Sequence, residues 1–337
     1  MSTHQPALPL NHKSQAVNNP QLTDQNAQDK AKCKLFLSLQ TIKGFGTKSL
    51  SYFYSFTQNQ HINWENKEEI YYHLMQAFQE NKRLKCPTKQ HFLDALININ
   101  PIITQYQKQQ IIILPKWSPD YPTRLASVQE APIFFFLKGN LKALNAKHSV
   151  AIIGTRFPTK IGFQAGTRLG EVLAQNGFLI VSGLAKGCDT VGHQGSLNQN
   201  GQTVAVLAHG LDQKTYPAEN HALAERILAQ NGALISEYPL GTKCNQGYFV
   251  QRDRWQAGLS DAVILIESDA KGGSNHTIRF AKSFHRKIAC FYLEDNNWLK
   301  DLKSEINQYL LQQEEATKLS TASELKRFIE ELKQLRT

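Results

Sequence analysis

Basic side chains, glycines and hydroxyl groups gather at four places in this sequence, each following an apolar run that predicts a β-strand. Backbone N–H groups, the positive end of a helix dipole and a guanidinium or ammonium group together favour binding of an anion such as phosphate. Ligands of an open parallel sheet bind outside the carboxyl ends of its strands, which is where these places fall. The four places are residues 154–159, 182–189, 249–260 and 271–277. For the first place, the alternative is that Gly154 only makes a turn and Arg156 is solvated. The residues expected to form the site are Gly154, Thr155, Arg156, Ser182, Gly183, Lys186, Phe249, Arg252, Arg254, Gly273 and Ser274.

The third place combines positive charge with aromatic rings. Arg252 and Arg254 flank Asp253, and Phe249 and Trp255 lie close by in the sequence. Phosphate contact together with aromatic stacking is how proteins hold a single strand of nucleic acid without sequence preference. The alternative is a core helix that carries an Arg–Asp pair, and the sequence leaves both interpretations open.

Groups that could catalyse a reaction are sparse. Cys188 has one candidate base, His193, and no third group to orient it, so we expect the thiol to be a packed small hydrophobe. Asp189 is expected to cap a helix by accepting backbone N–H groups, and His193 and His209 are expected to have structural roles. We expect no catalytic residue, no metal and no cofactor.

The composition favours a soluble protein with an anionic partner. The 337 residues carry a formal net charge of +10, and 41% of them are hydrophobic. Net basicity favours nucleic acid, an anionic membrane or an acidic protein as partner. The five cysteines are scattered without a C-x-x-C pair, and the first residues lack a secretory pattern, so we expect reduced thiols and a cytoplasmic location. No apolar run approaches the roughly 18 residues of a membrane span.

Apolar runs alternate with helical segments through the second half of the chain. Runs that are apolar on both faces predict a parallel sheet covered by helices on both faces, an α/β fold of the extended Rossmann-like kind. The expected strands are 150–154, 178–183, 203–207, 233–235, 262–267 and 287–292.

Four segments are expected along the chain. Residues 1–30 are rich in Gln, Asn and Pro and are expected to be a disordered tail. Residues 31–110 are expected to form a small helical domain, and 111–147 a connecting segment whose apolar run, 132–137, forms a bridge or an added edge strand. Residues 148–337 are expected to form the Rossmann-like domain, closed by C-terminal helices and without a winged-helix domain.

The helical domain has the outline of a helix-hairpin-helix or SAM-like module. Two short helices are expected on either side of the turn 43–47, and further amphipathic helices at 66–80 and 88–97. The glycines of the turn could bring N–H groups to a phosphate, or they could only join two packing helices.

A series of short segments, taken in their order along the chain, closely resembles the segments of the DNA processing protein A family (DprA, also called Smf). The resemblance covers about residues 33–293. The matching segments are Asp120–Pro122, Ala131–Pro132, Lys138–Asn140, Gly154–Arg156 with Pro158–Thr159, Ser182–Asp189 with His193, Leu207–Asp212, Tyr216–Asn220, Ser236–Pro239, Phe249 with Arg252–Arg254, Ala257–Ser260 and Gly273–Ser274.

The resemblance implies a protein that binds single-stranded DNA, forms a homodimer and loads the RecA recombinase on incoming strands in natural transformation. It implies DNA contacts for Arg156, Lys186, Arg252 and Arg254. It also implies loop-forming roles for Gly154, Thr155, Ser182, Gly183 and Gly273.

The chain departs from the family pattern at several points. Asp253 stands where the family usually has asparagine, Trp255 replaces an aliphatic residue, and the usual Pro-Gly turn is missing after 290–292. A DprA-like paralogue acting in phage defence or on a mobile element is therefore an alternative.

Two further alternatives come from related Rossmann-like groups. A nucleotide hydrolase would need a carboxylate in the loop 271–280, where Phe280 stands instead. A small-nucleotide sensor could use the same phosphate loops. A dinucleotide dehydrogenase is disfavoured, because no G-x-G-x-x-G follows the first strand.

Overall fold

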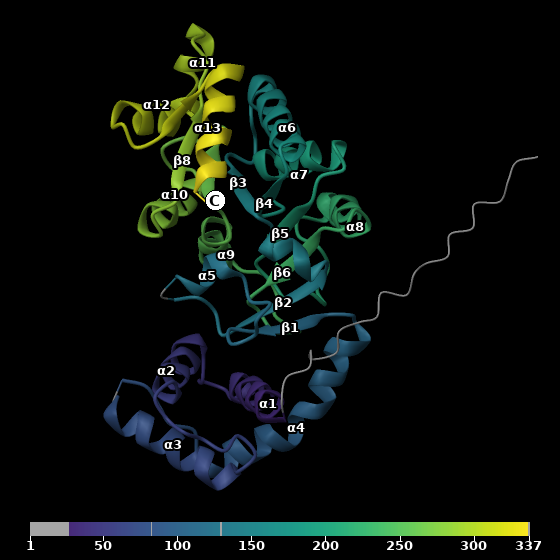
Figure 1. Cartoon of the computed structure of the whole chain (residues 1–337), viewed down its shortest axis with the longest axis vertical. Coiled ribbons are helices and arrows are strands. Elements are labelled where there is room, and N and C mark those ends of the chain that lie inside the picture. Colours follow the sequence, from purple (N-terminus) through teal and green to yellow (C-terminus); the bar gives the residue numbers. More distant parts are fainter. Residues whose placement is uncertain (1–26, 82, 129, 336–337) are drawn as a thin grey trace, which may run out of the picture.

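The computed structural model describes residues 27–335, except 82 and 129, as a helical region beside a larger α/β region (Figure 1). Within these residues the strands form one nine-stranded sheet in the order β1-β2-β6-β5-β4-β3-β7-β8-β9. The strands are β1 (Ile112–Pro115), β2 (Phe134–Gly139), β3 (His148–Ile153), β4 (Phe178–Ser182), β5 (Thr203–Leu207), β6 (Ala233–Ser236), β7 (Ala262–Leu265), β8 (Lys287–Phe291) and β9 (Thr317–Leu319).

Seven of these strands, β3 to β9, are parallel to their neighbours, and the β1–β2 hairpin is added antiparallel beside β6. The chain runs from β3 outward through β4, β5 and β6, and then crosses to the other side of β3 to form β7. The loops after β3 and β7 therefore meet at the point where the strand order reverses, which is the usual ligand position in such sheets.

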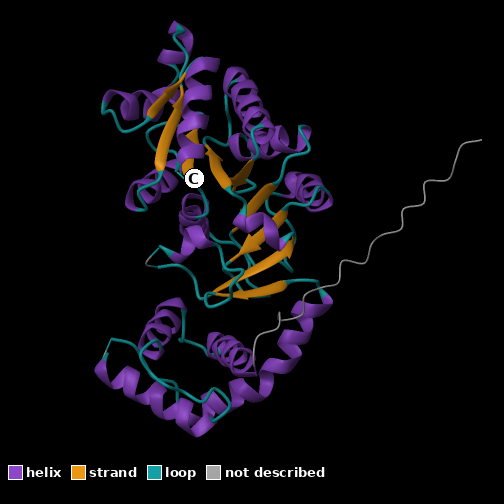
Figure 2. Ribbon diagram, viewed as in Figure 1, coloured by secondary structure: helices purple, strands orange, loops and turns teal. Residues whose placement is uncertain are grey.

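Helices cover both faces of the sheet, as the sequence predicts (Figure 2). One face packs on α6 (Lys160–Gln175), α7 (Cys188–Asn198), α8 (His221–Ala229) and α13 (Ala322–Gln334), and the other on α9 (Gln246–Gly258), α10 (Ser274–Ser283) and α12 (Glu305–Gln312). In β3, Val150 and Ile152 face the first layer, whereas Ala151 and Ile153 face the second. This period of two with apolar residues on both sides is the pattern that predicts a doubly covered parallel sheet.

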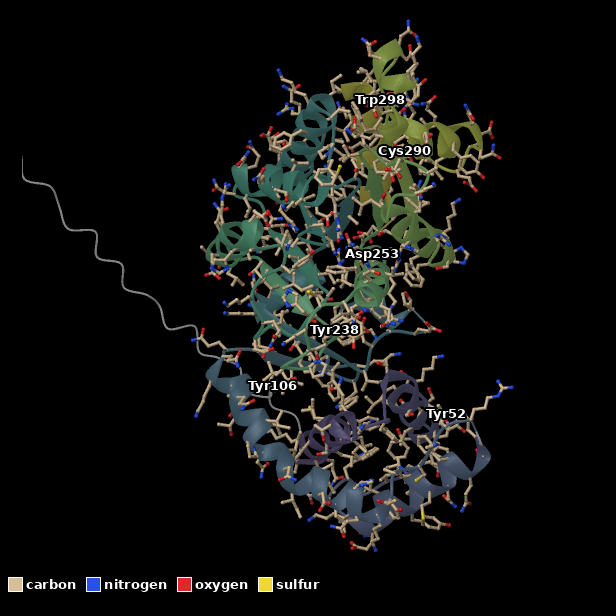
Figure 3. All side chains as sticks on the ribbon, turned by 180° about the vertical axis from the view of Figure 1, so that it is seen from behind. Tyr52, Tyr106, Tyr238, Asp253, Cys290 and Trp298 are labelled. Carbon is tan, nitrogen blue, oxygen red and sulfur yellow. The ribbon has the colours of Figure 1, made fainter. Side chains whose placement is uncertain are left out.

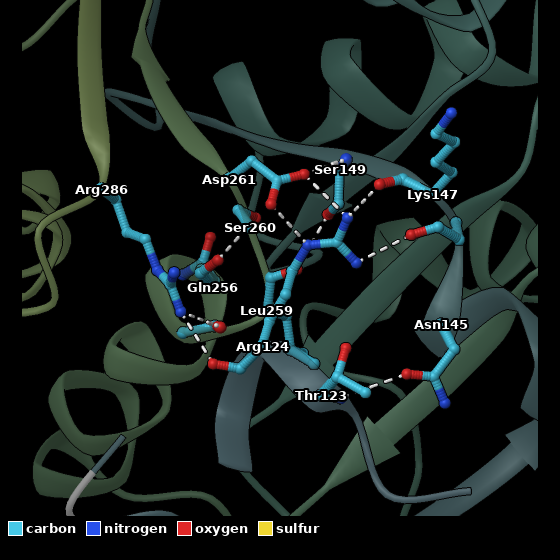
Figure 4. Close-up of polar contacts among 12 residues, drawn as sticks. Thr123, Arg124, Asn145, Lys147, Ser149, Gln256, Leu259, Ser260, Asp261 and Arg286 are labelled. Carbon is cyan, nitrogen blue, oxygen red and sulfur yellow. Dashed lines mark hydrogen bonds and ion pairs between the residues drawn. The ribbon is translucent and has the colours of Figure 1, made fainter. Parts of the chain in front are cut away.

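A buried ion pair closes the amino ends of the strands, opposite the edge where ligands are expected. Arg124, in α5 (Thr123–Ala126), donates to both carboxylate oxygens of Asp261 at 2.8 and 2.7 Å (Figure 4). Asp261 also accepts from the N–H of Ser149 at 2.9 Å, so it ties β3 to the start of β7. Breaking such a pair leaves an uncompensated buried charge, so this edge is expected to be rigid.

The helical region consists of α1 (Ala27–Thr41), α2 (Thr47–Thr57), α3 (Lys67–Glu80) and α4 (Lys89–Lys108). It packs on the sheet edge formed by β1 and β2, where the ring of Tyr106 stacks on that of Phe136 with 4.9 Å between centroids. The Tyr106 hydroxyl also accepts from the N–H of Leu240 at 3.1 Å.

Several boundaries differ from the expected ones. Helix α1 begins at Ala27, so residues 27–30 of the expected tail are helical, while the rest of that tail lies outside the described residues. Helix α4 continues through Pro101 to Lys108 instead of ending near residue 97. Proline inside a helix costs about 3 kcal/mol, and here it is offset by packing of Ile99 and Tyr106, each 1% exposed.

Strands β1 and β9 were not expected. Strand β1 lies in an apolar run of only four residues, 111–114, which is short enough to be taken for part of a connection. Strand β9 has three residues, is only half-buried and has no apolar run. The segment 111–147, expected to connect two domains and to form a bridge or an added edge strand with its run 132–137, contributes both β1 and β2 to the sheet. The last part of the chain adds α11 (Asn296–Lys300), the short η3 (Leu302–Ser304), α12, β9 and α13.

Candidate nucleic-acid interface

The loops that follow β3 and β4 lie against each other at the carboxyl edge of the sheet. The N–H of Cys188 donates to the carbonyl of Thr155 at 3.1 Å. Gly187 has φ +76°, and a Cβ there would lie 2.4 Å from the same carbonyl oxygen, so only glycine permits this approach. Arg156 and Lys186 both extend, exposed, from this pair of loops. The structure therefore brings together the two cations expected from the first and second places.

The loop after β7 joins the same junction. The N–H of Thr155 donates to the carbonyl of Glu267 at 2.7 Å. A Cβ on Gly154 would lie 2.6 Å from Sγ of Cys188, so this glycine is required by close packing. Gly154 and Thr155 thus form the junction itself, below the exposed side chains.

The N-terminus of α6, expected to bind an external anion, holds a carboxylate of the chain itself. Glu267 is fully buried and accepts from the N–H of Thr159 at 2.8 Å and from its hydroxyl at 2.7 Å. It also accepts from Nε1 of Trp298 at 2.9 Å. A Cβ on Gly162 would lie 2.3 Å from this carboxylate. The positive helix end is therefore already neutralised, and an anion must bind at side chains outside it.

The backbone N–H groups before α7 are also occupied from within. Asp189 accepts from the N–H of Gly183 at 3.1 Å and of Ala185 at 3.2 Å. The expected role of Asp189 as an acceptor of backbone N–H groups is present, but the donors belong to the preceding loop rather than to the helix. Burial raises the pKa of the Asp189 carboxyl, although the nearby guanidinium of Arg252 opposes this shift. Nδ2 of Asn220 donates to the carbonyl of Leu184 at 2.8 Å and holds the same loop from the other side.

Arg252 is a buried partner of this loop. Its side chain is 5% exposed and lies 3.8 Å from the Asp189 carboxylate and 3.5 Å from that of Asp253. The guanidinium occupies the space beside Gly183, where a Cβ would lie 1.3 Å from its Nη1. Gly183 therefore makes room for an arginine rather than for a ligand.

Asp253 lies beside Arg252, with its side chain 14% exposed, in the sheet-bearing part of the molecule (Figure 3). Burial raises the pKa of this carboxyl to about 7, with Asp189 adding to the shift and Arg252 opposing it. Nε2 of Gln256 donates to its Oδ1 at 2.8 Å. Two carboxylates thus share one guanidinium.

Arg254 is held by a second carboxylate. Its Nη2 donates to Glu237 at 2.8 Å, and its guanidinium lies 4.1 Å from the ring centroid of Trp255. The side chain of Arg254 is 15% exposed, and Trp255 is fully buried. Helix α9 therefore has the properties of the core helix with an Arg–Asp pair that the sequence left as an alternative.

Phe249 connects α9 to the exposed cations. Its ring lies 5.7 Å from the guanidinium carbon of Arg156 and 5.4 Å from the ring of Tyr216. The ring is half-buried, and Tyr216 is 47% exposed.

The remaining expected site residues are less directly involved. The hydroxyl of Ser182 is buried and donates to the carbonyl of Ile152 at 2.6 Å, linking β4 to β3. Gly273 is exposed, whereas the hydroxyl of Ser274 is buried and donates to that of Ser268 at 2.7 Å.

Cys188 and His193 are core residues. Both are fully buried, and burial raises the pKa of the Cys188 thiol well above its ordinary value. Burial lowers the pKa of His193 to about 3, and its Nδ1 lies 2.6 Å from the hydroxyl oxygen of Thr203. The thiol packs as a small hydrophobe, as predicted, and His193 is neutral at ordinary pH.

Three residues of the site were not recognised in the sequence. Glu267 was assigned to the end of a strand, although a charge directly after a buried apolar run was a usable indication. Asn220 and Glu237 pair with groups more than ten residues away, which no local pattern reveals.

These features define a class of protein: a Rossmann-like sheet whose carboxyl edge exposes cations, with a carboxylate of the chain itself at the N-terminus of α6. A family model described as DNA recombination-mediator protein A matches residues 112–330, and the chain belongs to that family. The protein Smf of Synechocystis sp. is 38% identical over 196 residues, which is 57% of this chain and 49% of that protein. The DNA processing protein DprA of Bacillus subtilis is 37% identical over 173 residues, 51% of this chain and 58% of that one. The chain thus spans about half the length of these curated relatives.

Two solved structures share the architecture. DprA of Streptococcus pneumoniae superposes with a TM-score of 0.68 and 25% identity, covering 87% of this chain and 95% of that one. DprA of Helicobacter pylori, whose structure is described as showing a single-stranded DNA binding mode, superposes with a TM-score of 0.58 and 29% identity, covering 68% and 98%. Within the parts of this chain that the structure describes, no helix has the length and apolarity to cross a membrane.

Proposed function

We propose that this chain binds single-stranded DNA along the carboxyl edge of its sheet, protects incoming strands and loads RecA on them in natural transformation. Membership of the DNA recombination-mediator protein A family supports this proposal, as does the single-stranded DNA bound by the Helicobacter pylori relative. The role is one of binding rather than catalysis, and its place is the cytoplasm. Association into a homodimer, which would extend the DNA track across two molecules, is part of the proposal and is checked by light scattering with and without DNA.

The observation that carries the proposal is the junction of the two glycine-rich loops. Because Cys188 donates to Thr155 and Gly187 packs on the same carbonyl, Arg156 and Lys186 extend from one rigid unit. Lys186 is paired with Glu219, but their side chains are 46% and 63% exposed. Exposed ion pairs contribute little to stability, so a phosphate can displace Glu219 at small cost.

Arg252 and Arg254 act differently in this proposal from their role in the family resemblance. Arg252 is buried, Arg254 is 15% exposed, and both are paired with carboxylates, so we assign them to positioning. Arg252 holds the loop before Lys186 through Asp189, and Phe249 supports Arg156. Direct phosphate contact is assigned to Arg156 and Lys186.

The small-nucleotide sensor is the second candidate, and one observation weighs against it. A nucleotide whose phosphates occupied the N-terminus of α6 would meet the Glu267 carboxylate, which accepts from Thr159. A second negative charge at that position would be repelled. A long polyanion that contacts the outer side chains avoids this repulsion.

The test is the affinity for a fluorescent oligo-dT measured by anisotropy. Arg156→Ala or Lys186→Ala should each weaken binding about tenfold, since a charge-assisted hydrogen bond contributes about 1.5–3 kcal/mol, part of which solvent replaces. The double variant should lose more than either single variant. Lys287→Ala is the matched control, because Lys287 has similar exposure and an ion pair but begins β8 at the opposite edge. Equal affinity of the double variant and the control would contradict the proposal.

A further inference from the structure

Phe157 is an apolar ring left in solvent beside the proposed phosphate contacts. It is 72% exposed, the largest value for a large hydrophobic side chain among the residues described. Phenylalanine usually buries its ring, because each exposed apolar surface costs free energy. A polar residue at this position would not disturb the core. The ring therefore does not serve the packing of the fold, and a ligand is the remaining use for it.

A pair of aromatic rings also lies beside the neighbouring cation, with one of the two rings in contact with it. Arg156 lies 5.7 Å from the centroid of Phe249, and Phe249 lies 5.4 Å from Tyr216. Tyr216 is 47% exposed, so one side of this pair remains accessible. In the described part of the chain, no aromatic ring stacks on Phe157. Phe157 follows Arg156 in the chain, and Tyr216 lies near it through Phe249. Each of these two rings therefore keeps an exposed face near the cation.

The charge around these rings selects the kind of partner. Arg156 precedes Phe157, Lys160 follows it by three residues, and Lys186 extends from the loop that packs on the Arg156 backbone. A purely apolar protein surface would leave these cations unpaired. A nucleotide strand satisfies both features, since each flat base is attached to a phosphate.

We infer that Phe157 and Tyr216 stack on bases of the strand whose phosphates contact Arg156 and Lys186. This inference rests on the proposed function and adds the bases to the recognised chemistry. Stacking accepts every base, because all four have a flat face, so the site favours single strands without selecting a sequence. A duplex offers its bases only at its ends and is bound more weakly.

The experiment compares two fluorescent oligomers of equal length, oligo-dT and an abasic strand that has the same phosphates without bases. The wild-type protein should bind oligo-dT more tightly. Phe157→Ala should weaken oligo-dT binding about tenfold, within the range measured for base–aromatic stacks, and leave the abasic strand unaffected. Tyr216→Ala should act in the same direction. Tyr72→Ala is the control, because Tyr72 is 53% exposed on α3, in the helical region.

A second readout does not depend on affinity. Phe157→Trp should restore oligo-dT binding, and its added fluorescence should be quenched by oligo-dT but not by the abasic strand. Phe157 is exposed, so the melting temperatures of these variants should match that of the wild type.

The outcomes separate the inference from the proposed function. If the wild-type protein binds neither oligomer, the proposed function fails. If it binds both equally and Phe157→Ala changes nothing, the strand is held by phosphate contacts alone and the inference is overturned. If Phe157→Ala weakens the binding of both oligomers to the same degree, the inference is also overturned, because the ring would then only hold the conformation of the loop.

Discussion

Arg252, Asp253 and Asp189 show how a cation near the site can serve the fold rather than the ligand. The guanidinium lies against Gly183 and near two carboxylates, those of the buried Asp189 and the mostly buried Asp253. Its charge compensates theirs, and Asp189 in turn holds two N–H groups of the loop that precedes Lys186. The geometry of the exposed lysine therefore depends on a buried arginine.

Asp253→Asn tests this arrangement through stability and its pH dependence. The carboxyl titrates near 4 in an unfolded chain and at about 7 in the folded one. The folded state thus binds the proton more tightly, so this contribution to stability is present below about pH 4 and is lost as pH rises through about 7. Between pH 5 and pH 8 the free energy of unfolding of the wild type should fall by at least about 1 kcal/mol more than that of the asparagine variant, since one pKa unit corresponds to about 1.4 kcal/mol.

Urea unfolding at the two pH values measures that difference. Asp189 and Arg252 are present in both proteins, so their own contributions largely cancel in the comparison. Affinity for oligo-dT should stay within about twofold, because Arg252 is buried and does not reach the strand. Markedly tighter binding by the variant would mean that Arg252 or Arg254 reaches phosphate, as the family resemblance implies.

At the scale of elements, the beginning of α6 is the most informative. Its N-cap Thr159 accepts from the N–H of Gly162 at 3.0 Å, and Glu267 from the neighbouring strand end accepts from Thr159. One carboxylate thus links the loop after β7 to the start of α6, where its negative charge lies at the positive end of the helix dipole.

Glu267→Gln should destabilise the protein by about 1–3 kcal/mol. The amide keeps one acceptor oxygen but turns an NH₂ group toward a donor, which leaves a buried group unsatisfied. Thermal and urea unfolding measure the loss, and Glu225→Gln, on the exposed face of α8, should be neutral. Unchanged stability of Glu267→Gln would mean that the carboxylate does not hold the helix start, and the N-terminus of α6 would again be open to a nucleotide phosphate.

At the scale of the whole molecule, the charge of +10 adds long-range attraction to the local contacts. For single strands, the logarithm of the binding constant falls linearly with the logarithm of salt concentration, by about 0.7 per phosphate contacted. The double variant Arg156→Ala/Lys186→Ala should therefore have a slope smaller by about 1.4. Anisotropy titrations at several salt concentrations check this, and a slope equal to that of the wild type would show that these side chains do not contact phosphate.

The sequence alone determines the α/β class, the main strands of the sheet and the exposed pair Arg156 and Lys186. These follow from local information: runs such as 178–182 are apolar on both faces, and glycines with cations come directly after them. Only the tertiary structure decides which charged groups are paired within the protein and which remain exposed for a ligand. Arg252 and Glu267 look like ligand-binding or strand-end residues in the sequence, because their partners Asp189 and Thr159 are distant along the chain. Their burial follows from the convergence of the loops after β3, β4 and β7 at one sheet edge, which is a property of strand order and not of any single segment.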